Sequence, residues 1–325
     1  MQFKTEAKGE SLLKKVDISN YLVYILFIIV ITIFALWLGT TFFSETNILN
    51  IVRQTTMISI MAIAMTFVIG GGNIDLSIGS IAGLVGLITA LILESTGSIL
   101  LSVFSGIILG AGIGLINGLF VTVVGIPAFL VTLGMMGIIR GFAMWVTGTV
   151  PVPIHNATYT FLFGLGTVGV IPTLLLWTIF FLIIGCIALY FLPYGRQVLA
   201  IGGNKLSAKY TGVKVGLITT LTFVFSGAAA AFAGILYTGR LQSARWTFGD
   251  GDELSVIAAV ILGGTALSGG SGNIVGAVVG ALLIGTINNG LIIGGLTVSQ
   301  QMIIRGAIII LVVSLGAIGK KRMGG

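Results

Sequence analysis

Long stretches of this chain contain almost only apolar residues, and many of them are as long as a helix that crosses a bilayer. Hydrophobic residues make up 56% of the 325 positions and charged residues only 8%, whereas soluble domains carry about 25% charged residues. So little polar surface cannot solvate a globule. The composition therefore predicts an all-α protein that passes through the membrane many times.

A membrane span needs about 20 apolar residues, and this rule predicts about ten spans in a single transmembrane domain covering residues 1–325. The first run is not followed by a small-residue cleavage site, so we expect it to remain as a span. The expected spans are 20–41, 51–70, 76–94, 98–121, 128–147, 172–192, 215–238, 254–269, 273–293 and 299–318.

The basic residues gather in three places, and cytoplasmic loops of membrane proteins hold the excess of lysine and arginine. With ten spans, all three clusters fall on one side, which predicts that both termini are cytoplasmic. This also accounts for the net charge of +7 without a nucleic-acid partner. The clusters are Lys4, Lys8, Lys14 and Lys15, then Arg196, Lys205, Lys209 and Lys214, then Lys320, Lys321 and Arg322.

Three short phrases occur twice in the same order, which indicates an internal repeat. They are Asp75-Leu76-Ser77, Gly114–Gly118 and Ile138–Gly141, echoed by Glu253-Leu254-Ser255, Gly285–Gly290 and Ile303–Gly306. We expect repeat one at about 47–147 and repeat two at about 215–318. Each unit has four spans, and they begin on opposite sides of the membrane. Inverted repeats of this kind are typical of transporters.

Several polar residues in or beside the spans are candidates for a substrate pathway. Glycines 70 to 72 break the helix before the first phrase, and non-helical backbone at membrane depth is tolerated only where protein or a water-filled cavity satisfies it. The alternatives are that Asn73 simply caps the next helix and that the asparagines bond between helices. The pathway candidates are Asn73, Asp75, Ser77, Asn117, Asn288 and Glu253.

Arg140 and Arg305 lie within predicted spans, where each costs about 2.5 to 3.5 kcal/mol unless it is paired. The nearest carboxylates by the logic of the repeat are Asp75 and Glu253. We expect the two arginines to hold the bundle together through ion pairs, or to reach the helix ends, more than to touch substrate.

Glycines recur at every fourth position in two of the spans. Such spacing lets helix backbones approach closely, so it predicts tight helix contacts and not a functional site. The two stripes are Gly106, Gly110, Gly114 and Gly118, and Gly272, Gly276 and Gly280.

No part of the sequence carries the pattern of an enzyme. There is no G-x-x-x-x-G-K-[ST] phosphate loop, so the chain is not expected to bind ATP in that way. No cluster of histidine, cysteine or carboxylate residues has metal-ligand spacing, and His155 is the only histidine. We therefore expect no catalytic residue, metal or cofactor.

Three runs resemble the inner-membrane permeases of bacterial ATP-binding cassette (ABC) importers for monosaccharides, such as the ribose, galactose, xylose and autoinducer permeases. The runs are Gly71–Ser80, Asp252–Gly264 and Gly195–Gly212, and the similarity extends from about Asn47 to Leu315. The resemblance implies an architecture like that of the vitamin B12 importer. It also implies a bacterial inner-membrane location.

The resemblance further implies three partners: a second permease chain, identical or different, a cytoplasmic ATPase that hydrolyses the ATP, and an external sugar-binding protein. The polar connection at about 194–214 resembles the coupling helix that contacts the ATPase. Leu206 and Ser207 depart from the Glu-Ala of the family phrase, which puts a salt bridge there in doubt. The matching residues are Gly195, Arg196, Gly202, Gly203, Asn204, Ala208 and Gly212.

The sequence thus predicts the permease subunit of an ABC importer that moves a ribose-like monosaccharide into the cytoplasm. Two alternatives remain open. The chain could be a branched-chain amino acid permease, which shares the architecture. It could also be a secondary transporter driven by an ion gradient, since such proteins use inverted repeats and broken helices too.

Overall fold

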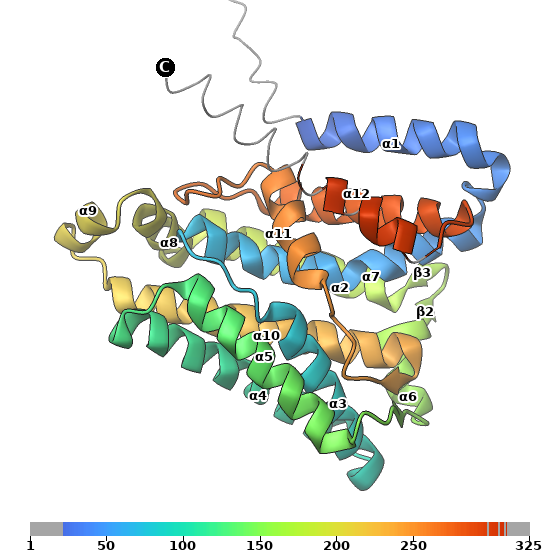
Figure 1. The fold of residues 1–325 in the computed structure, drawn as a ribbon, viewed down its shortest axis with the longest axis horizontal. Helices are drawn as coiled ribbons and strands as arrows, with labels where there is room; N and C mark the ends of the chain where they lie inside the picture. The colour runs from blue at the N-terminus through green and yellow to red at the C-terminus, as the bar shows by residue number, and fades with distance from the viewer. Residues whose placement is uncertain (1–21, 298, 305, 309, 311–325) are drawn as a thin grey trace, which may run out of the picture.

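The computed structural model describes residues 22–297, 299–304, 306–308 and 310, and helices make up most of it (Figure 1). The helices are α1 (Leu22–Leu38), α2 (Glu45–Gly70), α3 (Ile78–Thr96), α4 (Ile99–Leu119), α5 (Ala128–Thr147), α6 (Ala157–Thr160), α7 (Thr173–Cys186), α8 (Pro193–Gly203), α9 (Lys205–Tyr210), α10 (Val215–Leu241), α11 (Asp252–Leu262) and α12 (Ile274–Ile293). Shorter helical turns are η2 (Gly39–Thr41), η3 (Phe120–Val124), η4 (Phe161–Leu165) and η5 (Ile187–Phe191).

Two short pairs of strands complete the secondary structure of the described residues. Strand β1 (Val152–Pro153) pairs antiparallel with β4 (Ser243–Ala244), and β2 (Thr167–Val168) pairs antiparallel with β3 (Ile171–Pro172). The first contact ties the connection after α5 to the end of α10.

Eight helices in the described part of the chain are long and apolar enough to cross a membrane. They are α1, α2, α3, α4, α5, α7, α10 and α12, with α1, α4 and α7 extended by the turns that follow them. This confirms the prediction of an all-α protein with many membrane passes. Half of the tenth predicted span, 299–318, lies outside the described residues.

The ninth predicted span, 254–269, is wrong in length. α11 has 11 residues, and at 1.5 Å per residue it extends only about 16 Å, roughly half of a bilayer core. The helix ends at Gly263, and Gly264, Gly269 and Gly270 then adopt positive φ angles. The apolar run in the sequence therefore extends beyond the helix, into a segment where glycines turn the backbone.

The long helices divide into a buried group and an exposed group. Most of α2, α3, α10 and α12 is buried, whereas α1, α4, α5 and α7 are largely exposed. The exposed faces carry large apolar side chains such as Leu36 and Trp145. An apolar outer surface of this extent is suited to contact with lipid.

The helices of the two halves make matching contacts. α4 packs along α10 while α12 packs along α2, and α3 packs on α10 while α11 packs on α2. α2 and α10 contact each other at the centre. Exchanging α2, α3 and α4 with α10, α11 and α12 therefore leaves the set of contacts unchanged. The assignment of 47–147 and 215–318 as repeats stays a prediction that this pattern favours.

Most glycines of the two stripes lie where helix backbones meet, as predicted. The exceptions are Gly106, which faces side chains of α3, and Gly272, which lies before α12 and also faces side chains. A Cβ atom on Gly110 would lie 2.5 Å from both the Gly227 oxygen and the Ala231 Cβ of α10, and one on Gly114 would collide with the Phe223 carbonyl. The second stripe faces a different partner, because Gly280 lies against the backbone of Ala259 in α11. Small residues here allow contact that any side chain would block.

The α4–α10 contact yields a first prediction. Gly110→Ala should destabilise the protein by about 1 to 3 kcal/mol, because the added methyl group has no room. Gly112→Ala in the same helix is the matched control, since no atom lies within 4 Å of its Cβ position. The measurement is the midpoint of thermal unfolding in detergent. Equal midpoints for the two variants would contradict the close contact.

Candidate functional site

The connection between α2 and α3 is non-helical and folds back against the end of α2. The Asn73 N–H donates to the Val68 carbonyl at 3.0 Å, and the Asn73 side-chain amide donates to the Gly71 carbonyl at 3.2 Å. Asn73 therefore closes α2 and does not cap α3. The residue before α3 is Ser77, whose hydroxyl makes no capping hydrogen bond.

Asp75 is fully buried and accepts three hydrogen bonds. The N–H and the hydroxyl of Ser77 donate to Oδ1 at 2.9 and 2.6 Å, and the Ser226 hydroxyl donates to Oδ2 at 2.7 Å. These three bonds satisfy both oxygens of the buried carboxyl group. Ser226 lies near the middle of α10, so Asp75 lies deep within the bundle.

Asn117 joins α4 to this group. Its side-chain amide donates to the Ser77 hydroxyl at 2.9 Å, while its own Oδ1 is buried without a hydrogen-bond partner. Thr132 of α5 reaches the Ile74 carbonyl at 3.3 Å. We call Asp75, Ser77, Asn117 and Ser226 the Asp75 network. Three of its members were predicted from the sequence, and Ser226 was not.

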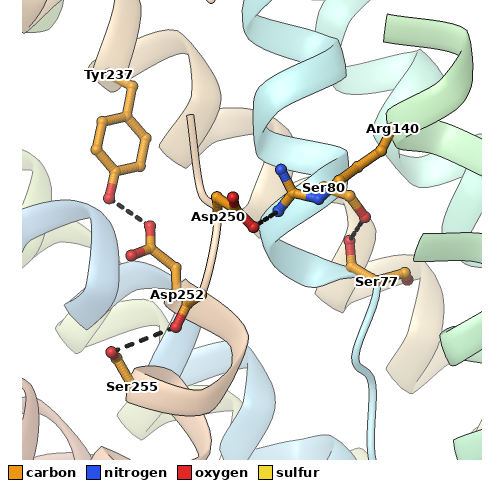
Figure 2. A network of polar contacts seen from close by, with 8 residues as sticks. Ser77, Ser80, Arg140, Tyr237, Asp250, Asp252 and Ser255 are labelled. Atoms are coloured by element: carbon orange, nitrogen blue, oxygen red, sulfur yellow. Dashed lines mark hydrogen bonds and ion pairs between the residues drawn. The ribbon is translucent and has the colours of Figure 1, made fainter. Parts of the chain in front are cut away.

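Glu253 lies where the start of α11 meets the start of α3. Its side chain is buried, and its Oε2 has no hydrogen-bond partner. A Cβ on Gly79 would lie 2.6 Å from this oxygen, so the carboxylate approaches the first turn of α3. Figure 2 shows the two helix starts side by side, with Ser77 on one and Asp252 on the other. The hydroxyl of Tyr237 donates to Asp252.

Arg140 of α5 pairs with Asp250, in the segment just before α11 (Figure 2). The Nη2–Oδ1 distance is 2.9 Å, but neither terminal nitrogen makes a well-directed hydrogen bond. The Arg140 side chain is 16% exposed and that of Asp250 is 64% exposed. The expectation of Asp75 or Glu253 as the partner is therefore wrong, although the expected ion pair exists. Arg305 lies outside the described residues.

Asn288 does not belong to the Asp75 network. It is buried in α12 beside Asn289, and the hydrogen bonds of the four network residues do not include it. The structure therefore brings three of the pathway candidates together at the start of α3. Glu253 approaches the same helix from the opposite half.

The predicted coupling segment forms α8 and α9 and is firmly attached to the bundle. Val198 and Ile201 are buried against α2 and α12 residues that include Phe67 and Ile274. The Asn204 side chain caps α9 by accepting from the Ser207 N–H at 2.9 Å. Of the seven residues predicted for coupling, Gly195 and Ala208 are buried and Gly202 is partly buried, while the other four are exposed: Arg196, Gly203, Asn204 and Gly212.

Gly202 holds a junction between three parts of the chain. A Cβ there would collide with the Gly70 carbonyl at the end of α2 and lie 2.6 Å from the Gly270 nitrogen. Gly270 also donates to the Gly70 carbonyl at 2.9 Å. Gly203 is different, since the atom nearest to its Cβ position is the Gly270 Cα, 3.9 Å away. Gly202 is needed for packing, and Gly203 offers an open surface.

A cavity of about 890 Å³ lies between this segment and the adjacent ends of α4 and α10. Asn73 lines it together with Gly202, Gly203 and Asn204. One predicted pathway residue thus shares a cavity with three predicted coupling residues. No sequence signal marked this cavity, because its walls come from four separate parts of the chain.

Comparison with known proteins identifies relatives of nearly full length. Residues 47–313 match the family described as branched-chain amino acid transport system / permease component. The ribose import permease of Escherichia coli K12 is 39% identical over 85% of this chain and 87% of its own. That of Bacillus subtilis 168 is 39% identical over 89% and 90%. The D-allose permease of E. coli K12 is 34% identical over 97% and 98%. No solved structure matches.

The Asp75 network yields a second prediction. Ser226→Ala should lower the free energy of unfolding by about 1 to 3 kcal/mol, because a buried carboxylate oxygen loses its donor. Ser102→Ala is the control: Ser102 is equally buried, but its hydroxyl donates only to Ile99 of its own helix. Unfolding in detergent measures both. A loss at Ser226 no greater than at Ser102 would refute the role assigned to that bond.

Proposed function

Because this chain belongs to the branched-chain amino acid transport system / permease component family, we propose that it is the permease subunit of an ABC importer that moves a ribose-like monosaccharide into the cytoplasm. The observation that carries the proposal is the 39% identity to ribose import permeases over most of both chains. As a permease, the chain is a transport component. A separate ATPase hydrolyses the ATP.

Two features favour a sugar over a branched-chain amino acid. Permeases named for ribose, allose and arabinose are among the relatives that match this chain. The polar groups at the start of α3 are hydroxyls, an amide and a carboxylate, and Asn117 Oδ1 still lacks a donor. Such groups suit the hydroxyls of a neutral polyol. They offer nothing to hold the apolar side chain of an amino acid.

The matching contacts of the two halves support alternating access. α2 and α10 lie together at the centre, and each packs against a helix of the other half. α12 packs on α2, and α4 packs on α10. Units with such reciprocal contacts can rock against each other about the α2–α10 contact. The Asp75 network and Glu253 lie where the halves meet. They are therefore the residues proposed to line the passage.

The glycine junction offers a route from the ATPase to both halves. Gly202 lies in the last turn of α8 and touches Gly70 of α2 and Gly270 of the connection after α11. A displacement of α8 would therefore act on the end of α2 in one half and on the α11–α12 connection in the other. We assign α8 and α9 as the contact surface for the ATPase, with both termini on that same cytoplasmic side.

The other proposed partners are an external sugar-binding protein and a second permease chain. The largely exposed α5 carries Gly134, Gly137 and Gly141 with no atom within 4 Å of their Cβ positions. This open face leaves room for another helix. The binding protein would stabilise the outward-facing state through higher affinity for it.

Reconstituted uptake tests the function. Proteoliposomes containing this chain and its ATPase, with the sugar-binding protein outside, should accumulate labelled ribose only when ATP is enclosed. Dissipating sodium and proton gradients should have no effect. Uptake that follows an ion gradient without ATPase would establish the secondary transporter instead, and uptake of leucine in place of ribose would establish the amino acid permease.

Asp75→Asn tests the passage. Asparagine keeps the shape but turns one acceptor oxygen into a donor facing the Ser77 or Ser226 donors, so uptake should fall about tenfold at unchanged expression. Glu94→Gln at the other end of α3 is the control, because Glu94 is exposed. If the two variants transport equally, Asp75 has only a structural role.

Gly203→Leu tests coupling. The position is open, so leucine should leave folding intact while obstructing contact with the ATPase. ATP hydrolysis stimulated by sugar should then no longer be accompanied by sugar uptake. Ser95→Leu, an exposed change at the end of α3, is the control. Wild-type uptake by the Gly203 variant would remove this residue from the contact surface.

A further inference from the structure

Asp250 carries a carboxylate that is exposed although it lies deep within the bundle. Its side chain is 64% exposed, whereas that of its ion-pair partner Arg140 is 16% exposed. The residues of the Asp75 network and Glu253 are almost fully buried, with Glu253 at 8% the most exposed of them. In this conformation they present little polar surface to a solute. Asp250 therefore offers what they do not, a carboxylate that a solute can reach.

Two contacts place Asp250 within the hydrocarbon depth of the spans. At 1.5 Å per residue, its partner Arg140 lies about 18 Å from the start of α5 and about 10 Å from its end. The preceding Gly249 lies against α3, since a Cβ on Gly79 would collide with the Gly249 carbonyl. From Gly79, α3 continues for 17 residues, or about 25 Å. A bilayer core is about 30 Å thick, so both contacts lie within it.

The exposed surface of Asp250 cannot lie against lipid at this depth without a large cost. Charged side chains within membrane spans almost always face the interior of the bundle or a water-filled cavity. Once an ion pair is exposed to water it stabilises a fold little, so structure alone is a weak reason to place two charges here. The exposed surface of Asp250 therefore indicates a water-filled space in the middle of the membrane.

The Arg140–Asp250 pair also has hydrogen-bonding capacity to spare. Figure 2 shows the Arg140 side chain extending from α5 toward Asp250, yet neither of its terminal nitrogens makes a well-directed hydrogen bond. Glu253 lies near enough to Arg140 for their charges to attract, and its Oε2 likewise has no donor. A hydroxyl group both donates and accepts, so one hydroxyl can satisfy a carboxylate and a guanidinium together.

We propose that Asp250, together with Arg140, contacts the sugar as it moves through the passage. The carboxylate accepts hydrogen bonds from sugar hydroxyls, and the guanidinium donates hydrogen bonds to them. This inference rests on the proposed function, which supplies the sugar. The pair has no net charge, so it suits a neutral polyol, whereas the apolar side chain of an amino acid would leave both charged groups without hydrogen bonds.

Thiol labelling tests whether position 250 faces water, and it requires no transported sugar. Asp250→Cys is made in a Cys186→Ala chain, which removes the only native cysteine. The chain is reconstituted with its partners and treated with the membrane-impermeant reagent 2-sulfonatoethyl methanethiosulfonate, and its mass reports the modification. Adding Arg140→Gln in a second version avoids a buried arginine without a partner, in case Asp250→Cys alone does not fold.

Ile138→Cys in the same background is the labelling control. Ile138 is 67% exposed, but it lies two residues before Arg140 and so on another side of α5. Because only the thiolate reacts and apolar surroundings suppress its formation, position 250 should react at least about tenfold faster than position 138.

Sugar uptake per ATP hydrolysed tests the contact with the sugar itself. In Asp250→Asn a donor replaces one acceptor oxygen, so ribose uptake should fall about tenfold while ATP hydrolysis stimulated by the loaded binding protein continues. Asp250→Glu keeps the carboxylate and should retain most of the uptake. Thr247→Ala, an exposed change in the same segment, is the control and should alter neither activity.

Three results would overturn the proposal. Equal labelling at positions 250 and 138 would place Asp250 against lipid or against the second permease chain. Unchanged uptake by Asp250→Asn would remove it from contact with the sugar. A parallel loss of uptake and ATP hydrolysis in that variant, with a lower unfolding midpoint, would assign it a structural role. If the wild-type chain takes up no ribose, the proposed function fails, whereas fast labelling would still place Asp250 in a water-filled passage.

Discussion

The interior of a bilayer offers no water to a broken helix, so each interruption in this protein needs acceptors and donors from the protein itself. The Asp75 carboxylate meets that need at the start of α3. It accepts the Ser77 N–H and the hydroxyls of Ser77 and Ser226. Through Ser77 it also holds Asn117 of α4. One buried carboxylate thus fixes α3 against two neighbouring helices, and the packing around it depends on those bonds.

Close backbone contact is the second means of holding the bundle together. Lipid chains are as apolar as leucine, so helices in a membrane gain little by burying leucine against each other. Contact without side chains brings more atoms within van der Waals range, which explains the glycines of α4 against α10 and of α12 against α11. At Gly202 the same device joins α8 to both halves. Glycines within the spans thus allow helices to pack closely, and glycines at the ends of the spans allow separate segments to touch.

The sequence predicted what repeats and composition encode, and missed what depends on tertiary contact. Asp75, Ser77 and Asn117 stood out because polar residues in apolar runs are costly and these recur. Ser226 gave no signal, since a single serine in a run of small residues is unremarkable and its partner lies 151 positions away. α11 was predicted too long because hydropathy does not register the turn that glycines make. Arg140 pairs with Asp250 and not with the carboxylates that the repeat suggested, because a repeated sequence does not determine the direction in which a side chain points.

The two halves match in helix contacts but not in side-chain chemistry. At the start of α3, the Asp75 carboxylate is saturated with donors. At the start of α11, the repeat-related Glu253 leaves Oε2 without a partner. A buried acceptor left in that state costs about 1 to 3 kcal/mol, so the start of α11 bears a cost that the start of α3 does not.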